Sequence, residues 1–158
     1  MKIAVFAGSF DPITLGHEDL VRRSAGMFDK LVVAIGANSE KKCCYDTETR
    51  MNWIKGVLGD LENVEVHCYE GLTADYCKQI GAGYLLRGVR NAMDLAYEQQ
   101  IAEFNRRVAP EIETVLLMTR PELADISSTA VREMLRYGKS VKGMVPEGLA
   151  TILESLPR

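Results

Sequence analysis

The stretch Ala7-Gly8-Ser9-Phe10-Asp11-Pro12-Ile13-Thr14-Leu15-Gly16-His17 decides how this chain folds. An apolar run over residues 3–7 leads into it and predicts a buried strand. An amphipathic pattern over residues 18–28 leads out of it and predicts a helix. The stretch is therefore predicted to be the turn between a first strand and a first helix.

The composition of this turn favours a phosphate site. Gly8 and Gly16 let the backbone approach a ligand closely. A helix N-terminus offers unpaired N–H groups and a partial positive charge. We therefore expect Thr14 and His17, which lie where the helix begins, to face a nucleotide triphosphate.

Length and charge limit the class of protein. A chain of 158 residues is expected to form a single domain, residues 1–158, that buries about two-thirds of its unfolded surface. The net charge of −3 argues against a general nucleic-acid binder, which is usually basic. No apolar run approaches the roughly 20 residues of a membrane helix, and no signal peptide precedes the first strand, so a cytoplasmic protein is expected.

The cysteines do not have the spacing of a metal site. No C-x-x-C pair occurs, and only two histidines are present, so a zinc site is not expected. Cys43 and Cys44 are adjacent, and two reduced loop thiols are favoured over a reactive pair. Cys68 and Cys77 lie among apolar residues and are predicted to be small core side chains.

Strands and helices alternate along the rest of the chain. Further strands are predicted at residues 31–35, 64–68, 84–86 and 114–118, and helices at 47–58, 73–80, 91–108, 127–137 and from about 146. Thr47 is predicted to cap the helix at 47–58. Five short apolar strands separated by helices predict an α/β fold: a doubly wound, Rossmann-like five-stranded parallel sheet with helices on both faces.

Polar groups follow all five predicted strands. The carboxyl ends of parallel strands meet at one edge of the sheet, so these groups are expected to converge on one site. They are Ser9, Lys41, Thr73, Arg87 with Arg90, and the run 127–129. Neither G-x-G-x-x-G nor a P-loop sequence is present, which removes support from ordinary NAD binding and from P-loop hydrolysis.

Each candidate also has a simpler structural interpretation. His17 could be a surface or helix-capping histidine, and Lys41 and Lys42 could be solvated loop residues. The run 127–129 could be a plain N-cap. Glu98, judged by pattern alone, is expected to be an exposed helix residue.

Arg87 and Arg90 flank Gly88 at the end of a predicted strand, and two guanidinium groups around a tight turn suit bidentate phosphate binding. The alternative is two solvated arginines. The whole set contains cations, hydroxyls and one histidine, without a nucleophile–base pair or a carboxylate dyad. This inventory suits phosphoryl or nucleotidyl transfer, where positioning and charge neutralisation do most of the work.

At these residues the sequence resembles the nucleotidyltransferase superfamily marked by the T/H-x-G-H motif, and within it the bacterial phosphopantetheine adenylyltransferase family. The resemblance covers nearly the whole chain. Its most specific pieces are residues 8–17, residues 86–91 with Asp94, Tyr97 and Glu98, and residues 126–129.

The resemblance implies reversible transfer of the adenylyl group of ATP to 4′-phosphopantetheine, which gives dephospho-coenzyme A and pyrophosphate. The acceptor phosphate would attack the α-phosphorus in line. His17 would stabilise the transition state, with Lys41 and Arg90 completing the catalytic set. Ser9 stands where the family usually has threonine and would position the attacking phosphate.

The resemblance also assigns binding residues. For the acceptor they are Ser9, Lys41, Thr73 and Arg87; for ATP they are Ser9, Phe10, His17, Gly88, Val89, Arg90, Glu98, Leu123, Ala124, Asp125, Ile126, Ser127, Ser128 and Thr129. Residues 123–125 depart from the aromatic-rich version associated with this loop. Mg²⁺ is expected to enter with ATP, held by phosphate oxygens and water, and the family forms homohexamers.

Two alternatives stay open. One is a sister enzyme that adenylylates nicotinate mononucleotide or cytidylylates a phospho-alcohol. The cytidylyl branch usually carries Arg-Thr-x-Gly-Ile-Ser-Thr-Thr, whereas Leu123-Ala124-Asp125 precede Ile126 here. The other is a catalytically silent nucleotide-binding module, against which the joint presence of His17, Lys41, Arg87 and Arg90 counts.

Overall fold

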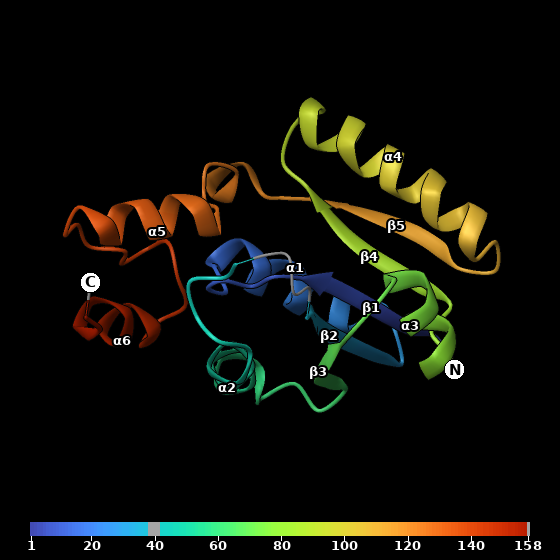
Figure 1. The fold of residues 1–158 in the computed structure, drawn as a ribbon, viewed down its shortest axis with the longest axis horizontal. Helices are drawn as coiled ribbons and strands as arrows, with labels where there is room; N and C mark the ends of the chain where they lie inside the picture. The colour runs from blue at the N-terminus through green and yellow to red at the C-terminus, as the bar shows by residue number, and fades with distance from the viewer. Residues whose placement is uncertain (38–41, 158) are drawn as a thin grey trace.

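A five-stranded parallel sheet in the order β3-β2-β1-β4-β5 forms the centre of the computed structural model, which describes residues 1–37 and 42–157 (Figure 1). Its strands are β1 (Ile3–Gly8), β2 (Lys30–Gly36), β3 (Val64–Tyr69), β4 (Tyr84–Val89) and β5 (Glu113–Met118). The helices are α1 (Leu15–Ala25), α2 (Thr47–Leu58), α3 (Thr73–Ile80), α4 (Ala92–Val108), α5 (Ser128–Arg136), α6 (Leu149–Ser155) and the short 3-10 helix η1 (Pro121–Leu123).

Alternate residues of the central strands face two separate cores, since side chains of a strand point to opposite faces in turn. Ala4 and Phe6 of β1 belong to a core shared with buried residues of α1, α2, α5 and α6. Val5 and Ala7 belong to a second core, with Cys77 of α3 and residues just after α4. Helices therefore cover both faces of the sheet, and the predicted Rossmann-like fold is confirmed.

Helix starts differ from the prediction where a cap was misjudged. Helix α1 begins at Leu15 because Thr14 is its N-cap, so the predicted start at residue 18 was too late. Asp46, not Thr47, caps α2, and its Oδ1 accepts the Thr49 N–H at 2.7 Å. A carboxylate at this position also interacts favourably with the positive end of the helix dipole.

One of the two cysteines predicted to be core is not. Cys77 is fully buried, as predicted, but Cys68 is exposed. The reason is the sheet order: β3 is an edge strand, and each of its residues is at most partly buried. Apolar neighbours in sequence cannot distinguish an edge strand from a central one.

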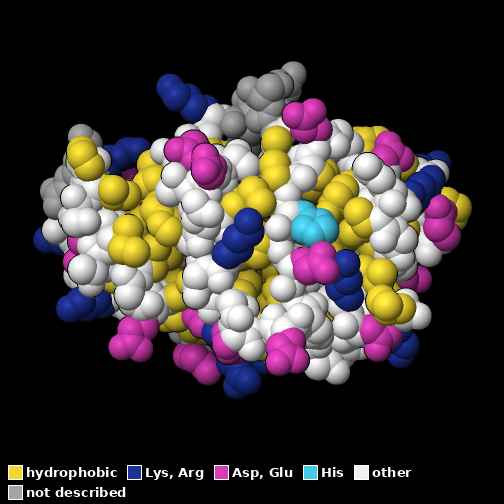
Figure 2. Space-filling model, turned by 90° about the horizontal axis from the view of Figure 1, so that it is seen from below, with side chains coloured by type: hydrophobic (Ala, Val, Ile, Leu, Met, Phe, Trp, Pro, Cys, Tyr) yellow, Lys and Arg dark blue, Asp and Glu magenta, His cyan; other side chains and the backbone are white. Residues whose placement is uncertain are grey.

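The surface carries both charges. On the face shown in Figure 2, basic and acidic side chains are interspersed among hydrophobic ones. Within the described part of the chain, no helix has the length and apolarity required to cross a bilayer.

Candidate active site

A cavity of about 700 Å³ opens at the carboxyl ends of β1 and β4. The sheet order reverses between these two strands, and such a switch point is where doubly wound sheets bind ligands. Eleven of the predicted site residues line it: Ser9, Phe10, His17, Thr73, Arg87, Gly88, Arg90, Glu98, Ile126, Ser127 and Ser128. The structure thus brings together groups from the loops after β1, β3, β4 and β5.

His17 is held at the start of α1 by a reciprocal cap. Thr14 Oγ1 accepts the His17 N–H at 3.3 Å, and His17 Nδ1 accepts the Thr14 N–H at 3.0 Å. The Phe10 ring packs against the imidazole with centroids 4.9 Å apart. His17 is therefore part of the helix cap, as one interpretation of the sequence allowed. The cap uses only one nitrogen of its ring.

The same contacts define the charge and tautomer of this histidine. Burial, together with the positive charges of Arg87 and Arg90, lowers the pKa of His17 to about 4. The imidazole is therefore neutral at pH 7. Because Nδ1 accepts a backbone N–H, the single ring proton lies on Nε2. His17 can thus donate one hydrogen bond through Nε2, which has no partner among the described residues.

Part of the hydrogen-bonding capacity of Arg87 is used within the chain. Its Nε and Nη2 donate to Glu98 Oε2 and Oε1 at 2.8 and 2.7 Å, and its Nη1 donates to the Ala7 carbonyl at 2.7 Å. Glu98 is only 6% exposed, so the expectation of an exposed helix residue was wrong. The cause is a partner on β4, eleven residues earlier, which helical periodicity cannot reveal.

Arg90 is the more available cation. Its backbone N–H and its Nε both donate to Asp94 Oδ2, at 3.0 and 2.9 Å, and its Nη groups have no partner among the described residues. Gly88, between the two arginines, packs against α1. A Cβ built there would lie 2.4 Å from a Leu20 methyl carbon, so any larger residue would have to displace the Leu20 side chain.

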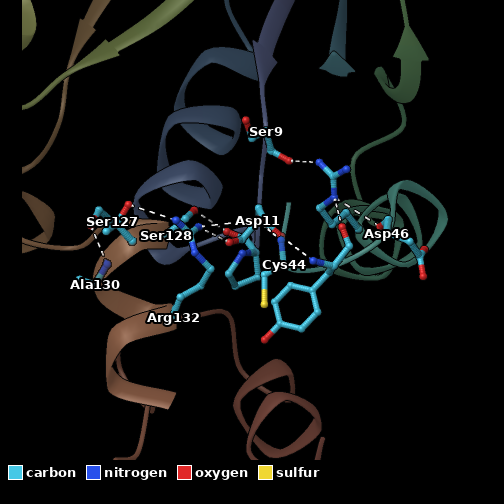
Figure 3. Close-up of polar contacts among 12 residues, drawn as sticks. Ser9, Asp11, Cys44, Asp46, Ser127, Ser128, Ala130 and Arg132 are labelled. Atoms are coloured by element: carbon cyan, nitrogen blue, oxygen red, sulfur yellow. Dashed lines mark hydrogen bonds and ion pairs between the residues drawn. The ribbon is translucent and has the colours of Figure 1, made fainter. Parts of the chain in front are cut away.

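The N-terminus of α5 borders the cavity (Figure 3). Ser127 Oγ accepts the Ala130 N–H at 3.0 Å, which is the N-cap alternative of the sequence. Ser128 Oγ donates to the Pro12 carbonyl at 2.7 Å, and Arg132 donates to Thr129 Oγ1 at 3.3 Å. The cap hydroxyls are thus used internally, and the free N–H groups of the first helical turn remain as the feature able to hold an anion.

Other predicted residues lie elsewhere. Val89 is buried in β4, the run 123–125 does not line the cavity, and Thr129 lines a second cavity beside α5. Lys41 lies outside the described residues. The lining residues outside the predicted site set include Tyr69, Asp94, Tyr97 and Thr119. Tyr69 ends β3, and its OH bonds Thr73 Oγ1 at 2.7 Å, so the rule that ligands lie at strand ends could have found it.

The side chains of the cavity do not form a protein metal site. Over residues 1–37 and 42–157, no group of three His, Cys, Asp or Glu side chains is placed to hold an ion. The two lining carboxylates, Asp94 and Glu98, are each bound by an arginine. This donor set fits a metal ion only if the ion is carried by a phosphate ligand.

Comparisons with known proteins agree with this geometry. The family model described as cytidylyltransferase-like matches residues 5–134. The phosphopantetheine adenylyltransferase of Flavobacterium psychrophilum is 46% identical over 149 residues, which is 94% of this chain and 98% of that protein. The phosphopantetheine adenylyltransferase of Desulforudis audaxviator is 46% identical over 153 residues, 97% and 94% of the two chains.

A solved structure shares the fold at much lower identity. A putative nicotinate-nucleotide adenylyltransferase from Vibrio parahaemolyticus superposes with a TM-score of 0.71 at 18% identity, covering 97% of this chain and 91% of that one. At this identity the likeness concerns the architecture of the sheet and its helices.

Proposed function

Because the chain belongs to the phosphopantetheine adenylyltransferase family, within the cytidylyltransferase-like proteins, we propose that it transfers the adenylyl group of ATP to 4′-phosphopantetheine. The products are dephospho-coenzyme A and pyrophosphate, and the reaction is reversible. The observation that supports this most directly is a neutral His17 with its proton on Nε2, beside Arg90 in the cavity.

The mechanism follows from what this donor can do. The acceptor phosphate attacks the α-phosphorus in line, and negative charge grows on the α-phosphate oxygens. His17 Nε2–H and the free Nη groups of Arg90 stabilise that charge. Donors that the fold holds in place stabilise this charge more than water does, because they need no reorganisation as the charge develops. The leaving pyrophosphate is received by the N-terminus of α5, residues 127–129.

The acceptor side is assigned to Ser9, Thr73 and Arg87. An arginine carries five N–H donors, and three of those on Arg87 are used by Glu98 and Ala7. One N–H donor remains on each Nη, and these two donors can bind two oxygens of the same phosphate. Glu98 therefore orients the guanidinium of Arg87 and leaves it with donors for the acceptor phosphate. Through this ion pair with Arg87, Glu98 also contributes to the ATP side of the site.

Lys41 and Mg²⁺ complete the proposal. Lys41 is proposed to bridge the two substrates from the loop after β2. Mg²⁺ is proposed to enter on the triphosphate, because the cavity carboxylates are already paired, and it supplies charge neutralisation when bound.

The enzyme is further proposed to form a homohexamer in the cytoplasm. Support comes from apolar side chains exposed on α4 and at the edge strand β5: Met93, Phe104 and Met118 are 82%, 53% and 64% exposed. Large apolar side chains exposed on neighbouring elements are a feature of association surfaces. Light scattering gives the mass directly.

One assay tests the main proposal. The protein is incubated with ATP, Mg²⁺ and 4′-phosphopantetheine, and pyrophosphate release is measured. In parallel reactions nicotinate mononucleotide replaces the acceptor, or CTP and a phospho-alcohol replace both substrates. Pyrophosphate only with 4′-phosphopantetheine is expected. Release only with another acceptor would assign a sister activity, and binding of ATP without release from any acceptor would indicate a silent module.

A further inference from the structure

Side chains from two other elements hold the backbone carbonyls of the β1–α1 loop (Figure 3). Arg50 of α2 donates from Nη1 to the Ser9 carbonyl at 2.7 Å. Arg132 and Ser128 of α5 donate to the carbonyls of Asp11 and Pro12, each at 2.7 Å. Three carbonyls within four residues are thus fixed by partners outside the loop.

Arg50 is the least accessible of these partners. It is 4% exposed, and it lines neither the active-site cavity nor the cavity beside α5. Its Nε donates to the carbonyls of Tyr45 and Asp46, at 2.9 and 3.3 Å, and its Nη2 donates to Thr47 Oγ1 at 3.2 Å. Of these contacts, the hydrogen bond to the Ser9 carbonyl is the one that Arg50 makes directly to the β1–α1 loop.

The Ser9 carbonyl belongs to the same peptide plane as the Phe10 N–H. In a trans peptide unit these two groups point in opposite directions. The carbonyl points to Arg50, outside the cavity, so the Phe10 N–H points to the side of the cavity that Phe10 and His17 line.

This peptide orientation is held against a local backbone preference. Phe10 has φ of 46°, a left-handed conformation that residues with a Cβ rarely adopt. Turning over the Ser9–Phe10 peptide plane changes φ of Phe10 by about 180°, to the negative values that residues with a Cβ favour. The turned plane would present a carbonyl oxygen to the cavity instead of an N–H.

We propose that Arg50 is a positioning residue that keeps the Ser9–Phe10 peptide in the orientation whose Phe10 N–H donates to a substrate phosphate. The proposal rests on the adenylyl-transfer function above, since the Phe10 donor would be aimed at the phosphate that reacts. Loss of the Arg50 hydrogen bond favours the turned plane, which removes one donor and places an oxygen against an anion.

The first test compares two arginine variants. Arg50→Gln is expected to lower kcat about 100-fold, the scale of one lost transition-state donor, with the KM for ATP within about threefold of wild type. Arg22→Gln is the matched control, because Arg22 also donates to a backbone carbonyl, that of Val57, on the side of α1 away from the cavity. Its kcat should stay within about twofold of wild type. A kcat unchanged in Arg50→Gln would overturn the proposal.

Arg50→Lys keeps the Arg50 test decisive if Arg50→Gln folds poorly. A lysine retains the charge and one donor for the Ser9 carbonyl, so it should recover at least about a tenth of the wild-type kcat. A lysine variant that folds as the wild type does but is as inactive as a glutamine variant would contradict positioning through this hydrogen bond.

The second test does not depend on turnover. ATP, which carries the reacting α-phosphate, is titrated into ¹⁵N-labelled wild-type protein without the acceptor, and the Phe10 amide resonance is followed. A downfield shift of this amide proton is expected in wild type and in Arg50→Lys and should be lost in Arg50→Gln, while core amides such as that of Val21 stay unchanged. Absence of a Phe10 shift in wild type would refute the inference. If ATP shifts Phe10 but the wild-type assay shows no adenylyl transfer, the proposed function fails and the orientation of the peptide stands.

Discussion

The β1–α1 loop and helix α4 both border the cavity, but they differ in which kinds of side chain they bury. Phe10, Ile13 and Thr14 are all at most 2% exposed, and the polar groups of the loop are bonded within the same chain. The buried residues of α4 are the polar Glu98 and Asn105, while its large side chains Met93, Leu95, Tyr97 and Phe104 are exposed. A helix with polar residues inside and apolar residues outside is the reverse of a surface helix.

The difference indicates what each region needs. The loop reaches its structure from contacts within one chain, so substitutions there should act on chemistry and on the folding of the protomer. Helix α4 leaves apolar surface uncovered, so substitutions there should act on association. Four experiments separate these two expectations.

The largest effect is expected from His17→Ala. Loss of the Nε2 donor should raise the reaction barrier by about 3 kcal/mol, which lowers kcat at least 100-fold, with little change in ATP affinity. Steady-state kinetics and calorimetric ATP titration measure the two quantities. The molecular mass should not change, because His17 is not on α4. Full turnover would show that the role assigned to His17 is wrong.

A dependence of stability on pH is the next largest effect. The pKa of His17 is lowered to about 4 in the folded chain, against 6.5 as its ordinary value. Between these values the unfolded chain binds a proton that the folded chain does not. The free energy of unfolding therefore falls as pH is lowered through this window, by about 2 kcal/mol at pH 5 relative to pH 7 from this group.

Urea unfolding at pH 7 and pH 5 measures this difference. In His17→Asn the loss between the two pH values should be smaller than in wild type by about 2 kcal/mol. His67→Gln is the control, since it removes the other histidine, outside the cavity, and should leave most of the difference in place. An equal pH response in wild type and His17→Asn would mean that His17 is not held neutral by the loop.

The same contrast between loop and helix explains what the sequence could predict. The five strands, the convergence of the loops after four of them and the place of His17 in the cavity follow from apolar runs and from strand-end geometry. The burial of Glu98 does not, because it depends on Arg87 of another element. The exposure of Cys68 depends on which strand lies at the edge. The Arg50 contact with Ser9 spans 41 residues and leaves no periodic signal.

The third experiment concerns α4. Phe104→Glu places a charge at a side chain that is 53% exposed, so it should weaken association at least tenfold, about 1.4 kcal/mol or more, and leave the fold intact. Sedimentation at several concentrations measures the mass. Tyr137→Glu is the matched control, because Tyr137 is 67% exposed just after α5. A smaller mass in the control but not in Phe104→Glu would place the association surface on α5 instead.

The smallest effect is expected from a partly exposed ion pair that α4 makes at the edge of the cavity. Asp94 pairs with Arg90 four residues earlier, and the two side chains are 24% and 35% exposed. Such a pair is screened by solvent, so Asp94→Asn should lower the free energy of unfolding by at most about 0.5 kcal/mol. Glu98→Gln is the matched comparison, since Glu98 is nearly buried and its loss leaves the Arg87 guanidinium without its charged partner. Thermal unfolding of both variants should therefore show a larger drop in the unfolding temperature for Glu98→Gln than for Asp94→Asn. Equal drops would mean that burial does not distinguish the two pairs, and that α4 contributes to the cavity through its charges alone.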